Sequence, residues 1–379
     1  MSLNHNASIV TNGLVMYYDM ANTQKSWLGA PVTNAATTPD NLSSNRTDTT
    51  ACGSSFTDFS IGGPINNGAF VRVTRVGIAQ SGDWPFSFSY PYTVGAQFQF
   101  SCYARCINGT VRTLAATNPD ASGSASSLVL TPQWQRYSTT FTSGVQGGLQ
   151  FLRINRSNTD TNTVGSIYDV ACAQIEPYTF ASPYTNSTRT TAQAVADLTS
   201  NNAITATSLT YVNDGTFRFN DNASGNYMDC GNASALQITG AITIDAWVKP
   251  TTYSSVGNIV SKNFNSGYRF RLDSTGSLWW YVSGNALQGG TVALNTWAHV
   301  TVSGSNTGLS AYINGVLVAA NNTAYTPTSA GTSNLYVGCG IPGSETFNGT
   351  IASVKIYKRA LTADEIAQNF NAQRSRYGL

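Results

Sequence analysis

Hydrophobic and polar residues alternate with a period of two along many short stretches of this chain. In residues 351–357, Ile351, Ser353, Lys355 and Tyr357 fall on one side, and Ala and aliphatic residues fall on the other. This alternation is typical of a strand that buries one face. We therefore expect a half-buried strand here. Similar patterns predict strands near residues 13–19, 69–76, 96–106, 110–116, 127–130, 134–141, 149–154, 166–174, 242–250, 268–272, 278–282 and 297–302.

One stretch close to the end of the chain has a helical pattern instead. Thr362 is followed three residues later by Glu365, the spacing of a capping box at a helix N-terminus. Ile366, Ala367 and Phe370 then give one apolar stripe. We predict an all-β protein of two antiparallel β-sandwiches (jelly rolls), with a short C-terminal helix.

Composition narrows the classes of function. Only 10% of the 379 residues are charged and the net charge is +2, which argues against nucleic acid as a partner because phosphate binding needs a clustered basic surface. No stretch is long and apolar enough for a membrane span, and the first residues do not resemble a secretory signal. We therefore expect synthesis in a reducing cytoplasm, with the six cysteines acting as small buried residues.

Two motifs far apart in the chain carry a family resemblance. Residues 13–26 begin GLV and continue to D-x-A-N-T, and residues 347–379 read FNGTIASVKIYKRALTADEIAQNFNAQRSRYGL. Both resemble laminin-G-like (concanavalin A-like) jelly-roll domains, and the terminal R-Y-G-L resembles the variant found in structural proteins of tailed bacteriophages. The family segment that normally follows the first motif comes only near Asp197. The resemblance therefore implies a discontinuous domain, made of residues 1–33 and 190–379.

The intervening residues have a strand pattern of their own. QWQRYSTTF at 133–141 and YDVACAQIEP at 168–177, with a later ASPY and TR, resemble carbohydrate-binding-module-like jelly rolls of phage structural proteins. The last of these pieces normally closes such a domain. The resemblance thus implies an inserted sandwich over residues 34–189, which an exposed loop tolerates when the ends of the insert lie close together.

Catalytic residues are not evident. Glycosidases generally use two carboxylates, yet the chain has only three glutamates, and the acidic cluster of the family's hydrolases is missing. Glu365 is explained by the capping box, and Glu176 lies in the motif that closes the insert. His299 has no acid or nucleophile nearby in sequence, so we expect a structural role.

A calcium site is one alternative for a group of oxygen-bearing side chains. Laminin-G-like domains often bind calcium through one or two loop acids, and suitable oxygen ligands occur here at Asp221, Asn222, Asn226 and Asp229. The family's usual acid is replaced by Asn226. Ordinary Asn/Asp turns are the other interpretation of these residues.

A second candidate site lies on two predicted strands. Alternation places Arg269 and Arg271 on one side of residues 268–272, and Trp279 and Tyr281 on one side of residues 278–282. If both pairs share a surface, flat aromatic rings beside guanidinium donors suit a sugar ring. The alternative is that the other sheet, the inserted domain or a neighbouring subunit covers this face.

Taken together, the sequence predicts a non-enzymatic virion structural protein of a tailed phage, exposed on the particle as a decoration, fibre or neck/tail accessory. Its expected partners are other virion proteins, further copies of itself, most simply in a trimer, and cell-surface glycans. A free carbohydrate-binding lectin and an accessory module of a glycan-active enzyme are the alternatives. The last residues should fold back or dock on a neighbour, burying Tyr377 and Leu379.

Overall fold

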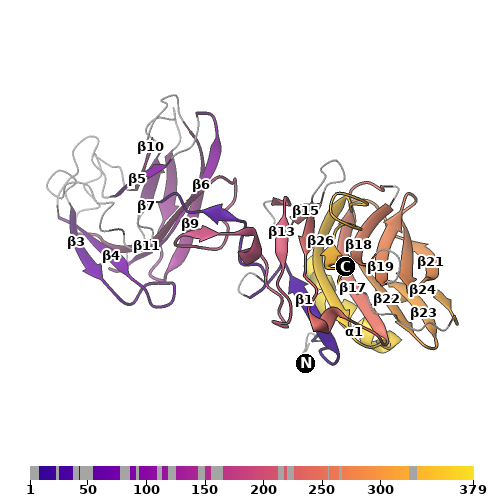
Figure 1. Ribbon diagram of the computed structural model, residues 1–379. Coiled ribbons are helices and arrows are strands. Elements are labelled where there is room, and N and C mark those ends of the chain that lie inside the picture. Colours follow the sequence, from indigo (N-terminus) through magenta and orange to yellow (C-terminus); the bar gives the residue numbers. More distant parts are fainter. Residues whose placement is uncertain are drawn as a thin grey trace. The chain divides into compact units, whose positions relative to one another are not determined.

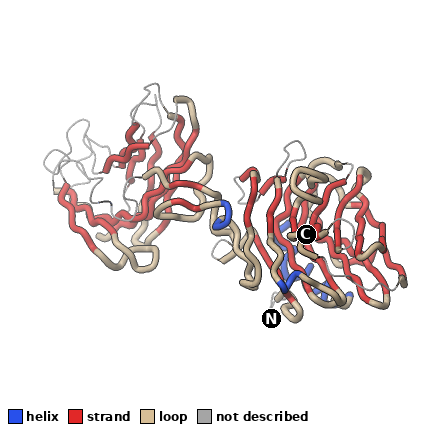
Figure 2. Tube along the Cα trace, viewed as in Figure 1, coloured by secondary structure: helices blue, strands red, loops and turns tan. Residues whose placement is uncertain are grey.

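The chain divides into two compact units. The computed structural model describes residues 8–22, 25–36, 42, 54–76, 86–90, 94–108, 113–117, 125–143, 150–154, 165–211, 217–219, 226–254, 256–263, 267–323 and 331–379. Unit 1 comprises residues 1–30 and 190–379, and unit 2 comprises residues 31–189. Strands dominate both units (Figure 2).

Unit 1 is a sandwich of two antiparallel sheets (Figure 1). In the described residues one sheet has eight strands, in the order β14-β15-β26-β17-β22-β23-β24 with β1 also paired to β26. The other has seven, in the order β13-β16-β25-β18-β19-β20-β21. The bounds in the first sheet are β1 Leu14–Asp19, β14 Thr210–Tyr211, β15 Phe217–Phe219, β17 Ile242–Pro250, β22 Ala298–Ser305, β23 Gly308–Ile313, β24 Val316–Asn321 and β26 Gly349–Tyr357; those in the second are β13 Thr205–Thr207, β16 Tyr227–Asp229, β18 Val256–Lys262, β19 Tyr268–Asp273, β20 Ser277–Val282, β21 Asn285–Thr291 and β25 Leu335–Val337.

The first strand of the chain pairs with the last strand, which is the pairing expected for residues 14–19. Strand β1 runs antiparallel to β26, with Tyr17 opposite Lys355 and Asp19 opposite Ser353. The loop that begins at Asp197 is tied to the same strand, because the Asp197 carboxylate accepts a hydrogen bond from the Tyr17 amide (2.8 Å).

The junctions explain how the chain leaves unit 1 and returns. On the unit 1 side, the Leu28 amide donates to the Ala194 carbonyl at 2.9 Å. On the unit 2 side, β2 (Val32–Thr33) pairs with β12 (Thr188–Arg189). Outgoing and returning segments are thus neighbours within each unit. Unit 2 consequently starts at Pro31, three residues before the boundary expected from the sequence.

Besides the short β2–β12 pair, the described part of unit 2 contains two larger antiparallel sheets. One has the order β3-β4-β11-β6-β9 and the other β5-β10-β7-β8. Phe88 and Phe100, from the two different sheets, lie 5.7 Å apart between ring centroids in a shared core. The strands are β3 Ser54–Phe59, β4 Phe70–Arg75, β5 Phe86–Tyr90, β6 Gln97–Cys106, β7 Thr113–Thr117, β8 Ala125–Val129, β9 Gln135–Thr142, β10 Gln150–Ile154 and β11 Ile167–Glu176.

The C-terminal helix α1 (Ala363–Gln373) begins as predicted. The Thr362 side chain accepts from the Glu365 amide, and the Glu365 side chain accepts from the Thr362 amide. Three short 3-10 helices, η3 (Thr191–Gln193), η4 (Ser234–Leu236) and η5 (Arg374–Tyr377), complete the described helical elements.

Strand β26 differs from its prediction, because all nine of its residues are buried. The expectation of a half-buried strand was wrong for a tertiary reason. Beneath α1, side chains of the helix contact the outer side of the sheet: Phe370 stacks on Trp247 and Gln373 hydrogen-bonds Lys355 of β26.

The last residues fold back on unit 1, but only partly as predicted. The Tyr377 ring stacks on Trp247, with centroids 4.0 Å apart, and is half-buried. Leu379 is 41% exposed, so its predicted burial was wrong. Gly378 adopts φ 74°, a left-handed conformation that ends the last helical turn, so Leu379 does not continue it.

Candidate functional site

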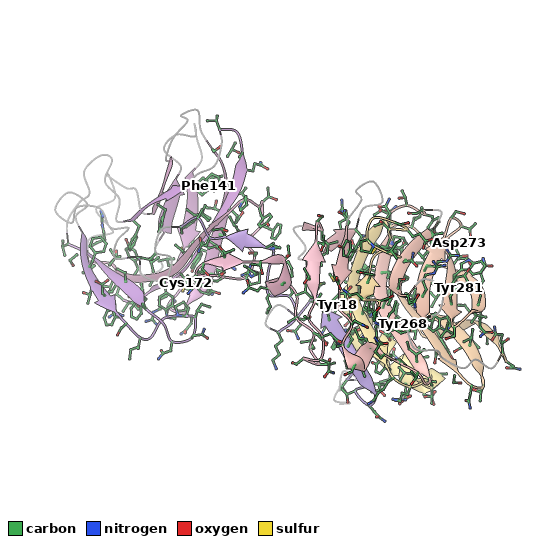
Figure 3. All side chains as sticks on the ribbon, in the orientation of Figure 1. Tyr18, Phe141, Cys172, Tyr268, Asp273 and Tyr281 are labelled. Atoms are coloured by element: carbon green, nitrogen blue, oxygen red, sulfur yellow. The ribbon has the colours of Figure 1, made fainter. Side chains whose placement is uncertain are left out.

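Strands β19 and β20 bring the four predicted sugar-binding residues together. The two strands are antiparallel, with Arg269 opposite Tyr281 and Arg271 opposite Trp279. Phe270 and Trp280, the residues between them, are fully buried on the core side. The pleat therefore puts the other four on the outer side of the seven-stranded sheet. We call Arg269, Arg271, Trp279 and Tyr281 the aromatic–arginine face; Figure 3 labels Tyr281 and the neighbouring Asp273.

The two aromatic rings of this face are nearly parallel. The Trp279 and Tyr281 centroids lie 5.4 Å apart with an interplanar angle of 7°. The Arg271 guanidinium lies 4.9 Å from the Tyr281 centroid and 5.5 Å from the Trp279 centroid, and its Nη2 donates to the Tyr281 hydroxyl at 2.9 Å. Arg271, Trp279 and Tyr281 are each half-buried. The other sheet of unit 1 therefore does not cover them.

A loop residue that sequence reasoning missed completes one end of the face. Glu345 accepts from Arg269 Nη1 at 2.9 Å and from the Asn258 side-chain amide at 2.9 Å. Arg269 is 8% exposed, so this ion pair is largely shielded from solvent on the arginine side. Glu345 is 76 residues from Arg269 in sequence. No local pattern could have predicted this ion pair.

Asp273 borders the other end and was also missed. Its carboxylate accepts from the Trp279 indole at 2.8 Å and from the Gln288 amide at 3.1 Å. It also accepts from Thr275 and Ser277, in the tight turn between β19 and β20. Burial alone would raise the pKa of Asp273, but the hydrogen bonds from Thr275, Trp279 and Ser277 lower it to about 2. The turn sequence Asp273-Ser-Thr-Gly was the one signal in the sequence that could have identified it.

The outer side of the sheet continues beyond these four residues. Tyr336 of β25 lies opposite Ser261 of β18, Ser261 lies opposite Arg269, and Arg269 lies opposite Tyr281. These residues form one row across four strands. Tyr336 is half-buried and contacts Tyr227 edge to face, with centroids 5.5 Å apart. The row thus carries aromatic rings at both ends.

The predicted calcium ligands do not form a described metal site. Asp221 and Asn222 lie outside the described residues. Asn226 is buried, and Asp229 accepts two hydrogen bonds from the Asn334 side chain (both 3.0 Å) and one from the Gly231 amide (2.8 Å). Within the described part of the chain there is no group of three or more His, Cys, Asp or Glu residues that could hold a metal ion. The donors around Asp229 support the turn interpretation.

His299 has an acidic partner that the sequence did not reveal. Its Nε2 lies 2.8 Å from Asp245 Oδ2, and Lys355 Nζ lies 2.7 Å from Asp245 Oδ1. All three side chains are fully buried. Burial alone would raise the pKa of Asp245, but the adjacent His299 and Lys355 hold it below its usual value. Asn369 of α1 also donates to Asp245 at 3.1 Å, so this cluster attaches the helix to the sheet.

The two remaining candidate acids also have structural partners. Glu365 makes two 2.7 Å bonds to the Arg359 guanidinium, and together with the helix cap these lower its pKa to about 2. Glu176 accepts from the Ser182 amide at 2.9 Å and from the Ser182 hydroxyl at 2.5 Å, although burial still raises its pKa.

Comparison with known proteins agrees with the resemblance in part of unit 1. Residues 222–367 match the family described as the concanavalin A-like lectin/glucanases superfamily. This segment is similar to that family. It contains β19, β20 and the whole aromatic–arginine face. The match supports the jelly-roll family, and the β-rich fold with one short C-terminal helix agrees with the predicted fold class. No curated protein matches the chain.

Several solved structures show weaker likeness. The binding domain of Paraclostridial Mosquitocidal Protein 1 is 18% identical (TM-score 0.38, 47% of this chain and 49% of that one). Domain 4 of AbnA, a GH43 extracellular arabinanase from Geobacillus stearothermophilus in complex with arabinotriose, is 18% identical (TM-score 0.37, 46% and 91%). The binding domain of Botulinum Neurotoxin DC in complex with SialylT is 16% identical (TM-score 0.39, 48% and 49%). This chain thus spans about half the length of the mosquitocidal binding domain, and likeness at these TM-scores carries no argument about function.

One further property concerns membranes. Among the helices that the structure describes, none has the length and apolar character needed to cross a bilayer.

Proposed function

We propose that this chain is a non-enzymatic, lectin-like protein that binds a saccharide on the aromatic–arginine face. The observation that carries the proposal is the half-buried, parallel pair Trp279 and Tyr281 with Arg271 beside it. Aromatic rings offer flat apolar surfaces with a negative face, which suit the C–H side of a sugar ring. Guanidinium groups close to the rings supply donors for hydroxyl oxygens. The similarity of residues 222–367 to the lectin/glucanase superfamily supports the same function.

The carboxylates beside this face support binding rather than hydrolysis. Glycoside hydrolysis generally needs one carboxyl group with a raised pKa that can act as an acid. The pKa of Asp273 is instead lowered to about 2, and five groups donate to its carboxylate. Glu345 is engaged by Arg269 and Asn258. Neither is poised to protonate a leaving group.

The test is a glycan-array screen with the labelled full chain, followed by calorimetry on the ligands it identifies. We expect Trp279→Ala and Tyr281→Ala each to weaken binding by about tenfold or more, as is usual when an aromatic anchor is removed. Trp134→Ala, which removes a half-buried indole from unit 2, is the matched control and should leave affinity unchanged. The proposal fails if no glycan binds, or if the control loses affinity as strongly as the two site variants.

The setting we propose is the surface of a tailed-phage particle, where the chain would serve as a decoration, fibre or neck/tail accessory. The similarity of the terminal RSRYGL and of the 168–189 segment to phage structural proteins supports this setting. Mass spectrometry of purified particles tests it. If the chain is missing from the particles and found free in the medium, it is instead a free lectin; if it is joined to a glycan-active enzyme, it is an accessory module.

We also propose self-association, with a trimer as the expected state. A surface with few charged groups offers little repulsion between copies, and symmetric closure lets weak polar contacts add up. Size-exclusion chromatography with light scattering measures the mass directly. A monomer at micromolar concentration would rule out self-assembly.

A further inference from the structure

The charged groups of the aromatic–arginine face are not equally paired. Arg269 is bound to Glu345 at 2.9 Å, and Asp273 accepts from Trp279, Gln288, Thr275 and Ser277. Arg271 is different. Among the described residues its guanidinium has a hydrogen bond to the neutral Tyr281 hydroxyl and no carboxylate partner. One positive charge on this face is therefore left for a ligand.

The geometry of Arg271 leaves its donors usable. The guanidinium lies beside the Tyr281 and Trp279 rings at 4.9 and 5.5 Å from their centroids. A guanidinium carries five N–H donors in one plane, so a single hydrogen bond to Tyr281 leaves other donors unused. Among the described residues only Nη2 has an acceptor, so Nη1 and the second hydrogen of Nη2 remain for a ligand, whereas Nε is buried. A half-buried guanidinium with spare in-plane donors is suited to a two-oxygen acceptor.

We infer that the saccharide bound by this face is acidic, and that Arg271 receives its carboxylate through a forked pair of hydrogen bonds. The inference rests on the proposed function and names the chemical class of its ligand. The ring that carries the carboxylate lies against Trp279 and Tyr281. Uronic acids and sialic acids both offer this chemistry.

A carboxylate fits this site better than a phosphate or a sulfate. Sites for phosphate groups gather several cationic donors, as in arginine clusters. Here the second arginine, Arg269, is already neutralised by Glu345, and Asp273 remains ionised at the edge of the site. One free guanidinium matches one singly charged, planar group.

The experiment compares matched pairs of oligosaccharides on the full chain by calorimetry. The pairs are an oligogalacturonate with its methyl ester and sialyllactose with lactose, and a sulfated oligosaccharide serves as a third probe. We expect the better acidic ligand to bind about tenfold or more tightly than its neutral partner, because hydrogen bonds to charged groups are the strong ones. The affinity for this acidic ligand should fall as the sodium chloride concentration is raised. Which pair shows the preference identifies the type of acid.

Three variants connect this preference to Arg271. Arg271→Gln should reduce the acidic-to-neutral preference to about twofold or less, and Arg271→Lys should keep only part of it because a lysine lacks the planar fork. Arg218→Gln, at an exposed position on β15, is the matched control and should keep the full preference. Melting curves confirm that each variant is folded.

The outcomes separate this inference from the proposed function. Equal binding of acidic and neutral ligands, with loss in Trp279→Ala, overturns the inference and leaves glycan binding intact. Binding of the sulfated probe as tightly as the carboxylated one also overturns it, because the site would then select charge alone. Failure of every glycan to bind overturns both proposals.

Discussion

Individual buried ionic groups hold unit 1 together at places where apolar residues would be usual. Asp245 lies between His299 and Lys355 with no solvent exposure, and Lys355 also bonds Gln373 of α1 at 2.7 Å. Removing charges from water is costly, so a buried ion pair such as Asp245–Lys355 adds little to the free energy of unfolding compared with apolar residues of similar size. Breaking it is a different matter, because the remaining charge has no compensation.

The first prediction concerns this pair. Asp245→Asn should lower the free energy of unfolding by about 3–5 kcal/mol, because the Lys355 ammonium is left buried without its counter-charge. The double variant Asp245→Asn/Lys355→Met should recover much of that loss. Asp364→Asn, in the exposed first turn of α1, is the control and should change stability by about 0.5 kcal/mol. Urea unfolding at pH 7 measures the stability of all three variants. An Asp245→Asn variant as stable as the wild type would contradict the prediction.

The second prediction concerns a buried lysine that has no acidic partner among the residues that the structure describes. Lys262 has no exposed surface, and its Nζ donates to Asn232 Oδ1 at 2.5 Å and to the Ser333 carbonyl at 2.6 Å. Burial lowers the pKa of Lys262 to about 8, whereas an unfolded lysine titrates near 10.4. Between these values the unfolded chain binds more protons than the folded one. The contribution of Lys262 to stability therefore rises with pH in this range.

Comparison with Lys262→Met isolates this effect, because buried tyrosines titrate in both proteins. Between pH 8 and 10 the free energy of unfolding of the wild type should rise by up to about 2 kcal/mol relative to that of the variant. Below pH 7.5 the difference in unfolding free energy should be flat. Lys358→Met, an exposed site in the same unit, is the control and should show no such rise. Chemical unfolding across this pH range provides the measurement. A difference that falls with pH would contradict the assignment.

At the scale of elements, the register of four strands decides how long a ligand the outer face can hold. Tyr336, Ser261, Arg269 and Tyr281 are directly opposite one another in successive strands. Neighbouring strands lie about 4.8 Å apart, so Tyr336 and Tyr281 are separated by about 14 Å across the sheet. A saccharide of several units is needed to reach both rings.

The third prediction follows from that spacing. Tyr336→Ala should leave the affinity for a mono- or disaccharide unchanged and weaken binding of a longer oligomer by about threefold to tenfold, since only the longer ligand reaches this ring. Tyr281→Ala should weaken both. A calorimetric series of increasing oligomer length tests this, with Tyr253→Phe, outside the row, as the control. Equal losses for short and long ligands would show that the row is not used as one surface.

At the scale of the whole molecule, each unit has its own sheets, and its ends are paired within it. The two short strands β2 and β12 hold the ends of unit 2 side by side. In unit 1, residues 26–28 pair with residues 194–196 through bonds of 2.8 and 2.9 Å. The hydrogen bonds that hold the two ends of each unit side by side are therefore made within that unit.

The fourth prediction is that the two units fold separately. Residues 31–189 expressed alone should melt cooperatively, and so should residues 1–30 joined to 190–379 by a short glycine–serine linker. The second protein should keep the glycan affinity of the full chain, because the aromatic–arginine face belongs to unit 1. Circular dichroism and calorimetry measure both properties. A non-cooperative or insoluble unit 1 would contradict independent folding.

The sequence by itself determined the features that depend on neighbouring residues. Period-two alternation placed Arg269 and Arg271 on one side of a strand, and Trp279 and Tyr281 on one side of the next. The capping box fixed the start of α1, because Thr362 and Glu365 satisfy each other's backbone groups within one turn. The opening motif near Gly13 and its delayed continuation at Asp197 correctly indicated that β1 belongs with the end of the chain.

Only the tertiary structure decided the features that depend on which elements cover a strand, or on contacts with residues distant in the sequence. Strand β26 is buried on both sides because α1 and the turn that follows it lie over the outer side of the eight-stranded sheet. An alternation pattern within the strand cannot indicate such a cover. Asp245 reaches His299 across 54 residues, and Glu345 reaches Arg269 across 76. These pairings leave Arg271 as the arginine of the face without a described acid, and that difference determines which ligand we expect. Local sequence sets the side to which each residue points, whereas the charge that remains for a ligand depends on contacts between distant segments.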